Sequence, residues 1–164
     1  MRNRAGPTAI PTPRPTAIPT AAPTITFLGH AGFDVRHAGF RLLVDPWLGG
    51  TAFDDGWSLL LPPPPFDPSG ITHLWISHEH PDHFSPSTLR LIPSEARPAI
   101  TVVLQQTSDH RVAEYFRAHG FGHVHEVDDG APFELRGLDG SVAGTLTTAA
   151  CAMGDSAFLL DLGG

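Results

Sequence analysis

The sequence contains no lysine, so its ten basic residues other than histidine are all arginine. Against these stand 17 acidic residues, which give a formal net charge of −7 with histidine neutral. A nucleic-acid-binding surface requires a cluster of basic side chains, and the sequence has none. We therefore expect no nucleic-acid partner.

Cysteine and long apolar runs are almost as scarce. Cys151 is the only cysteine, and one cysteine can form neither an internal disulfide nor the cysteine pair of a Rieske cluster. No apolar run approaches the roughly 20 residues that span a bilayer, and the N-terminal arginines are not followed by the apolar segment of a secretory signal. We expect a cytoplasmic protein with no membrane span.

Residues 1–23 form a segment rich in proline and threonine, in which PTAIPT occurs at Pro7–Thr12 and again at Pro15–Thr20. Because proline fixes φ and removes a backbone donor, we expect a disordered, extended tail, or a misassigned start codon. A docking segment for a proline-binding partner is the alternative. The rest of the chain, 24–164, has the composition of a globular domain.

Strands come first along this domain, βαβ units follow, and strands come again at the end. Helices are predicted over 86–92, with Ser85 as the N-cap, and over 108–119, with Gly120 as the stop. The prolines at 62–65 predict a loop. Apolar or alternating runs predict strands at 25–28, 32–36, 40–44, 71–77, 100–104, 124–127, 131–135, 142–148 and 157–162. This order predicts a mixed sheet with helices outside it.

The residues that carry chemistry gather in one segment, SHEHPDH at 77–83. On an extended strand end, residues i and i+2 point the same way, so His78 and His80 can present two imidazoles to one ion. Asp82 and His83 follow on the turn and can reach a second ion. Neutral imidazoles and a carboxylate suit zinc, and also iron or manganese. Solvated loop histidines are the alternative, but they do not explain so dense a cluster.

Other candidates have two interpretations each. Asp45 is either a turn former or a residue that supports a metal ligand from behind. His30 borders the site or lies in an exposed loop, and His123 and His125 suit either a metal or a surface strand. The remaining histidines are expected at the surface: His37, His73, His110 and His119.

The pattern His-x-His-x-Asp-His resembles the signature of metallo-β-lactamase-fold hydrolases. FLGHAG at 27–32 and LLVDPW at 42–47 resemble the family's first strand and turn and its next strand. The resemblance extends over 24–164 and is strongest over 25–92. Three segments resemble one branch of the family in particular, the branch similar to CMP-N-acetylneuraminate hydroxylase. They are residues 50–53, 56–60 and 77–85.

The resemblance implies an α/β fold, the αββα metallo-β-lactamase sandwich. We expect the chain to hold the N-terminal half to two-thirds of it, as a C-terminally truncated member. It implies a hydrolase in which a metal-activated water attacks a small molecule. The substrate is not specified, because the family acts on lactams, thioesters, phosphodiesters and lactones. A truncated, inactive member with weak or no metal binding is one alternative, and a non-enzymatic binding module is another.

Carried over residue by residue, the resemblance places one metal on His78 and His80 and the second on Asp82 and His83. It makes Asp82 the catalytic residue that orients the attacking water, with Asp45 as the support. One or two zinc ions are expected, with iron or manganese as alternatives.

The chain departs from the family where a further histidine ligand is expected, since residues 147–156 contain none. Cys151 is either a soft ligand in its place or a buried packing residue. Asp155 is either the family's bridging carboxylate or the opening of a strand, with the bridging aspartate beyond Gly164.

A partial sandwich leaves apolar sheet surface uncovered. We therefore predict poor solubility or self-association of the isolated chain, measured by light scattering at micromolar concentration. A clean monomer at that concentration would contradict this prediction.

Overall fold

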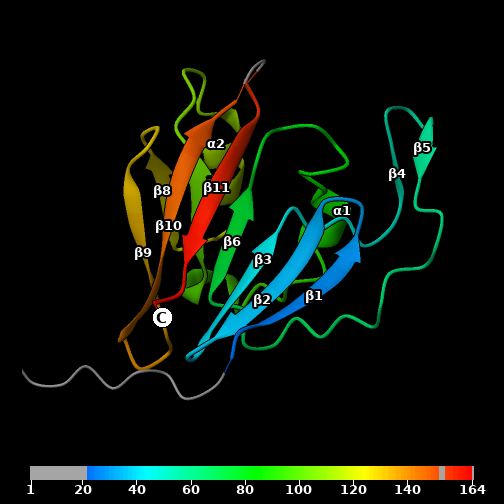
Figure 1. Ribbon diagram of the computed structural model, residues 1–164. Coiled ribbons are helices and arrows are strands. Elements are labelled where there is room, and N and C mark those ends of the chain that lie inside the picture. Colours follow the sequence, from blue (N-terminus) through cyan, green and yellow to red (C-terminus); the bar gives the residue numbers. More distant parts are fainter. Residues whose placement is uncertain (1–21, 152–153, 164) are drawn as a thin grey trace, which may run out of the picture.

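The computed structural model describes residues 22–151 and 154–163, so nearly all of the predicted tail lies outside the described residues. Figure 1 shows the elements in chain order. These are β1 (Thr24–Gly29), β2 (Gly32–His37), β3 (Phe40–Val44), β4 (Thr51–Ala52), β5 (Trp57–Ser58), β6 (His73–Ile76), α1 (Pro86–Leu89), a 3-10 turn (Arg97–Ala99), β7 (Thr101–Gln105), α2 (Arg111–Ala118), β8 (His123–Val127), β9 (Pro132–Arg136), β10 (Val142–Ala150) and β11 (Ser156–Asp161).

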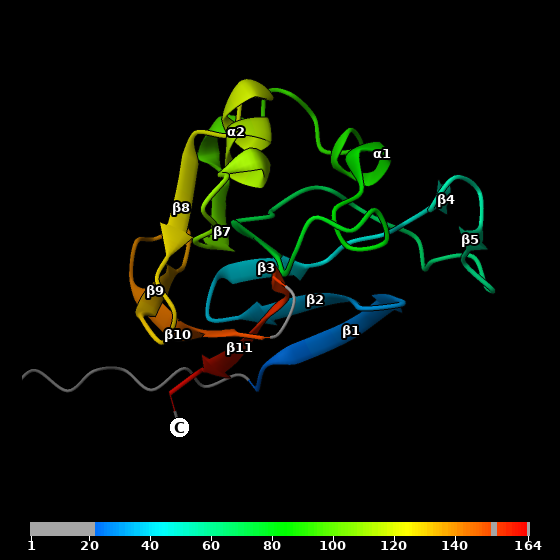
Figure 2. The ribbon, with the colours of Figure 1, turned by 90° about the horizontal axis from the view of Figure 1, so that it is seen from above.

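The strands form two stacked sheets and a separate hairpin. The larger sheet has the order β1-β2-β3-β6-β7-β8, antiparallel from β1 to β3 and parallel from β3 to β8. The smaller has the order β11-β10-β9, and β4 pairs only with β5. Figure 2 shows α2 on one face of the larger sheet and the smaller sheet on the other. This layering is the α/β architecture that the sequence predicts, with part of the αββα sandwich present.

Alternation along β6 and β7 divides the interior into two apolar cores. Leu74 and Val102 pack towards the helices, against Ile92 and Phe116. Their chain neighbours Trp75 and Val103 face the other way. They pack against Leu135 and Leu146 of the smaller sheet. Parallel strands covered on both faces are apolar at every position, which is why these runs predict buried strands.

The predicted strands are confirmed, whereas the helices are shorter than predicted. The first ends at Leu89, and Ile92 N–H reaches only Leu89 O in a single turn at 3.2 Å. Pro93 follows, and a proline disfavours helical conformation in the residue before it. The second helix begins at Arg111, because His110 adopts a left-handed φ of 55°.

Part of the larger sheet has an apolar face that the described residues do not cover. Ile25 and Phe27 pair with Val35 and Phe33, so all four lie on the face where Val35 joins the inter-sheet core. Ile25 is 62% and Phe27 58% exposed. Self-association through this face stays a prediction. None of the helices in the described ranges is long and apolar enough to cross a membrane.

Two histidines are buried, and their predicted surface placement is wrong. His37 and His73 are 8% and 4% exposed. His73 opens β6 and shares a face with Trp75, so the smaller sheet covers it. Burial, with a smaller effect from nearby His125, lowers the pKa of His73 to about 4. A histidine that begins an apolar strand is therefore part of the interior here.

This burial generates a pH prediction. The pKa of His73 falls from 6.5 to about 4 on folding, so the unfolded chain takes up a proton between these pH values that the folded chain does not. The stability that neutral His73 provides is complete above pH 6.5 and is lost as the pH falls towards 4. Between these limits the wild type should lose about 2–3 kcal/mol more unfolding free energy than His73→Asn in urea titrations. Exposed His119→Asn should follow the wild type, and an equal loss in all three proteins would contradict the assignment.

Candidate metal centre

The loop that follows β6 lies at one edge of the larger sheet. β3 and β6 are parallel, with Val44 beside Trp75, so Asp45 and the 77–83 loop leave the sheet side by side. β2 runs antiparallel to β3, which brings the β1–β2 turn and His30 to the same edge. Three chain segments thus meet where the strands end.

Asp45 fixes the loop to the sheet. Its Oδ1 accepts a hydrogen bond from Ser77 N–H at 2.7 Å, and its Oδ2 accepts one from the Ser77 hydroxyl at 2.7 Å. The same Oδ2 lies 2.9 Å from His83 Nδ1. The carboxylate is buried, so these contacts are shielded from water. Of the two interpretations of Asp45, these contacts agree with the one in which it supports a metal ligand from behind.

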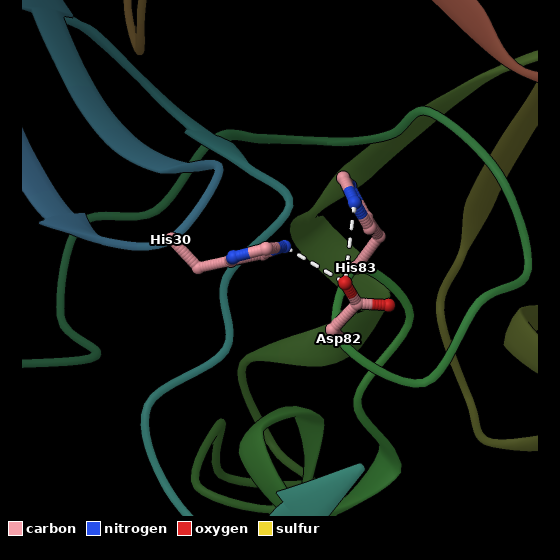
Figure 3. A group of neighbouring side chains, drawn as sticks. All are labelled: His30, Asp82 and His83. Atoms are coloured by element: carbon pink, nitrogen blue, oxygen red, sulfur yellow. Dashed lines mark ion pairs between the residues drawn. The ribbon is translucent and has the colours of Figure 1, made fainter. Parts of the chain in front are cut away.

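Figure 3 shows the first group of candidate ligands, with the His30 and His83 rings turned towards the Asp82 carboxylate. His30 Nε2 lies 2.7 Å and His83 Nε2 lies 3.7 Å from Asp82 Oδ2. His30 adopts a φ of 50° in the β1–β2 turn, a left-handed conformation that directs its ring into the site. The interpretation of His30 as a residue that borders the site therefore agrees with the geometry.

A second group lies on the other side of the loop. His78 Nε2 is 2.7 Å from His80 Nδ1 and 3.6 Å from Asp155 Oδ1. Asp155 immediately precedes β11, and the Ser156 hydroxyl donates to the carbonyl oxygen of Ser77. Asp155 is thus both the residue before a strand and a neighbour of the two histidines.

The environment sets the protonation of two of these imidazoles in opposite directions. Burial, followed by the charge of neighbouring His83, lowers the pKa of His78, which favours the neutral form that binds metals. Burial also acts to lower the pKa of His83, but the hydrogen bond and charge of Asp45 outweigh it and raise the pKa. Because Asp45 contacts Nδ1, the Nε2 atom of His83 faces Asp82.

The donor set fits a divalent metal ion. Within each group the ligand atoms all lie within 4.8 Å of one another, whereas tetrahedral ligands at about 2.1 Å from zinc are about 3.4 Å apart. Small side-chain movements close that difference. Asp82 Oδ1 is buried and has no hydrogen-bond partner in the structure. An unpaired buried carboxylate oxygen is costly, and a cation beside it removes that cost. The division of His78 and His80 from Asp82 and His83 is the one that the spacing predicts.

Several candidates lie outside both groups. Cys151 follows the end of β10 and is exposed, so its interpretation as a buried packing residue is wrong. Its thiol is 3.7 Å from Ala149 O and belongs to neither group of described ligands. His123 and His125 are exposed on β8 and also belong to neither. Ser77, which links Asp45 to the loop, has a role that the sequence analysis missed.

Comparison with known proteins identifies the family. The profile described as "Beta-lactamase superfamily domain" matches residues 24–150. The chain belongs to this superfamily. Solved structures with the same fold include CmlA, a diiron beta-hydroxylase from Streptomyces venezuelae. It superimposes with a TM-score of 0.61 and 22% identity over 86% of this chain and 28% of that one. The metallo hydrolase Igni18 from Ignicoccus hospitalis gives a TM-score of 0.52 and 18% identity over 83% and 54% of the two chains.

Curated relatives of this superfamily member share its sequence more closely. Cytidine monophosphate-N-acetylneuraminic acid hydroxylase from Danio rerio is 38% identical over 88 residues, 52% of this chain and 15% of the relative. The protein of that name from Xenopus laevis is 34% identical over 124 residues, 68% of this chain and 21% of the relative. The chain therefore spans between 15% and 21% of the length of these two relatives.

The contacts of Asp45 generate a stability prediction. Asp45→Ala removes the acceptor of Ser77 N–H and of the Ser77 hydroxyl and one of the partners of His83 Nδ1, and should lower the unfolding free energy by about 2–4 kcal/mol in urea titrations. Asp161→Ala, which removes an exposed carboxylate at the end of β11, should change it by less than about 0.5 kcal/mol. An Asp45→Ala variant as stable as Asp161→Ala would show that the carboxylate does not hold the loop.

Proposed function

We propose that the chain is the metal-binding part of a metal-dependent hydrolase that acts on a small molecule. The observation that carries the proposal is the convergence of one loop and two distant residues into two three-residue ligand groups. These groups are His30, Asp82 and His83, and His78, His80 and Asp155. The unpaired, buried Oδ1 of Asp82 supports a cation at the first group.

A divalent ion held there would lower the pKa of a bound water and polarise the bond to be cleaved. The residues of the chain do the rest. Asp45 fixes the tautomer of His83 so that Nε2 faces the ion, as carboxylates commonly do behind metal-bound histidines. Asp82 is the catalytic residue of this proposal: one of its carboxylate oxygens would bind the ion, and the other would accept a proton from the water.

Zinc fits the two imidazoles and one carboxylate of each group, and iron and manganese accept the same donors. The names of the relatives favour a second candidate, an iron-dependent hydroxylase. The curated relatives are hydroxylases by name, and CmlA is a diiron beta-hydroxylase. The identity of the bound metal separates the two candidates. The substrate itself and a cytoplasmic location stay predictions.

The test is metal content per chain, by elemental analysis of protein purified without chelator. Since there are two ligand groups, we expect about two equivalents of metal in the wild type. His80→Ala removes one ligand of the second group, and should bind about one equivalent less or lose metal about tenfold more readily on dialysis. His123→Ala, which removes an exposed histidine outside both groups, is the matched control and should retain the wild-type content.

Two other outcomes would change the conclusion. Metal near zero in the wild type, with His80→Ala indistinguishable from it, would overturn the proposal and favour a catalytically inactive family member. About two equivalents of iron in place of zinc would favour the hydroxylase.

A further inference from the structure

A cleft of about 540 Å³ opens on the His30 side of the candidate metal centre. It lies between the end of β1 and the segment that includes β5. Phe27 lines it from β1, and Trp57 and Leu60 line it from the opposite side, where they are 52% and 99% exposed. His30 also lines the cleft, so the cleft leads directly to the first ligand group.

The hairpin of β4 and β5 shapes this cleft. Figure 1 shows it at the margin of the molecule, apart from the two sheets. Its turn has left-handed φ angles at Phe53, Asp54 and Asp55, of 54°, 51° and 66°. Such angles are costly for residues other than glycine and commonly occur where the chain binds a ligand. The turn brings the Phe53 ring within 5.8 Å of His80 and 5.1 Å of Trp57.

Trp57 in turn lies edge-on to His30, with ring centroids 6.1 Å apart. Trp47, which is buried beneath the cleft, contacts the same imidazole at 5.6 Å. The hairpin therefore presents aromatic rings to both ligand groups: Trp57 to His30 and Phe53 to His80. A planar group that entered the cleft would stack on Trp57 and lie next to the ligands.

The side chains that line the clefts on the two sides of the loop determine which kind of ligand group each cleft would accept. The described residues that line the cleft beside His30 are aromatic, leucine, glycine and serine residues, and His30 is the only titratable one among them. The cleft on the other side of the loop is lined by Glu79, Asp109 and Asp155. No arginine among the described residues lines either cleft, and nearby Arg111 is already paired with Asp109 and Glu79. The surface of the cleft beside His30 is therefore suited to an uncharged apolar group, whereas a metal ion at the ligand groups would attract any anionic part of a ligand.

We infer that the cleft beside His30 binds the uncharged, planar apolar part of the substrate and places the bond to be cleaved at the first ligand group. This inference rests on the proposed hydrolase function. Trp57, which lines the cleft and is 52% exposed, offers the planar surface for this contact.

The test is calorimetric titration of the protein as purified with 2-naphthamide, an uncharged planar probe. Trp57→Ala should weaken 2-naphthamide binding about tenfold, because it removes the stacking surface, and Trp57→Phe should restore most of the affinity. Leu91→Ala is the matched control, because Leu91 is as exposed as Trp57, at 52%, but lies outside the cleft. It should change the affinity less than about twofold.

The contrary outcomes are distinct. Absence of 2-naphthamide binding, equal affinity in Trp57→Ala or an equal loss in Leu91→Ala would each overturn the inference. Metal content measured on the same preparation separates this failure from that of the proposed function. With metal bound and no 2-naphthamide binding, only the inference fails. A metal-free chain that binds 2-naphthamide would overturn the proposed function and with it the cleft's role in substrate binding.

Discussion

The buried carboxylate of Asp45 is the contact on which the candidate site depends. It joins the end of β3 to the loop that follows β6, through both the backbone and the hydroxyl of Ser77. Its contact with Nδ1 of His83 then determines which nitrogen of that ring faces Asp82. Because all three contacts are made by one buried group, they favour the conformation of the loop in which all three are formed.

The sheet gives this contact its rigidity. β3 and β6 are buried along their whole length and lie between two apolar cores, so their ends are fixed relative to one another. The carboxyl ends of adjacent parallel strands are a common place for ligand sites, because side chains from several strands meet there. Here they bring together acidic groups and imidazoles, a combination that favours cations.

Most of the fold follows from local patterns in the sequence. Alternating and apolar runs predict the strands, and the i, i+2 spacing predicts that His78 and His80 separate from Asp82 and His83. The β4–β5 hairpin was missed because each strand has two residues and its turn contains no glycine at the three left-handed positions. Its geometry depends on long-range packing of aromatic rings, which a short sequence window does not contain.

The rest of the site could not be predicted for a similar reason. Asp155 reaches His78 only because β11 starts beside the loop, where Ser156 contacts Ser77, and no local spacing encodes a contact across that distance. The sequence likewise left two interpretations of Cys151 open. Whether its side chain is buried depends on where β10 leaves the core, which the local sequence does not specify. Tertiary register, rather than residue type, determines which distant carboxylate or imidazole joins a ligand group.

The most direct measurement is anomalous diffraction at the zinc edge from crystals of the zinc-loaded protein. The account predicts anomalous peaks at the loop, one bounded by His30, Asp82 and His83 and the other by His78, His80 and Asp155. Zinc bound elsewhere on the chain, with no peak beside Asp82, would contradict the account, because the buried and unpaired carboxylate oxygen would then have no cation to explain it.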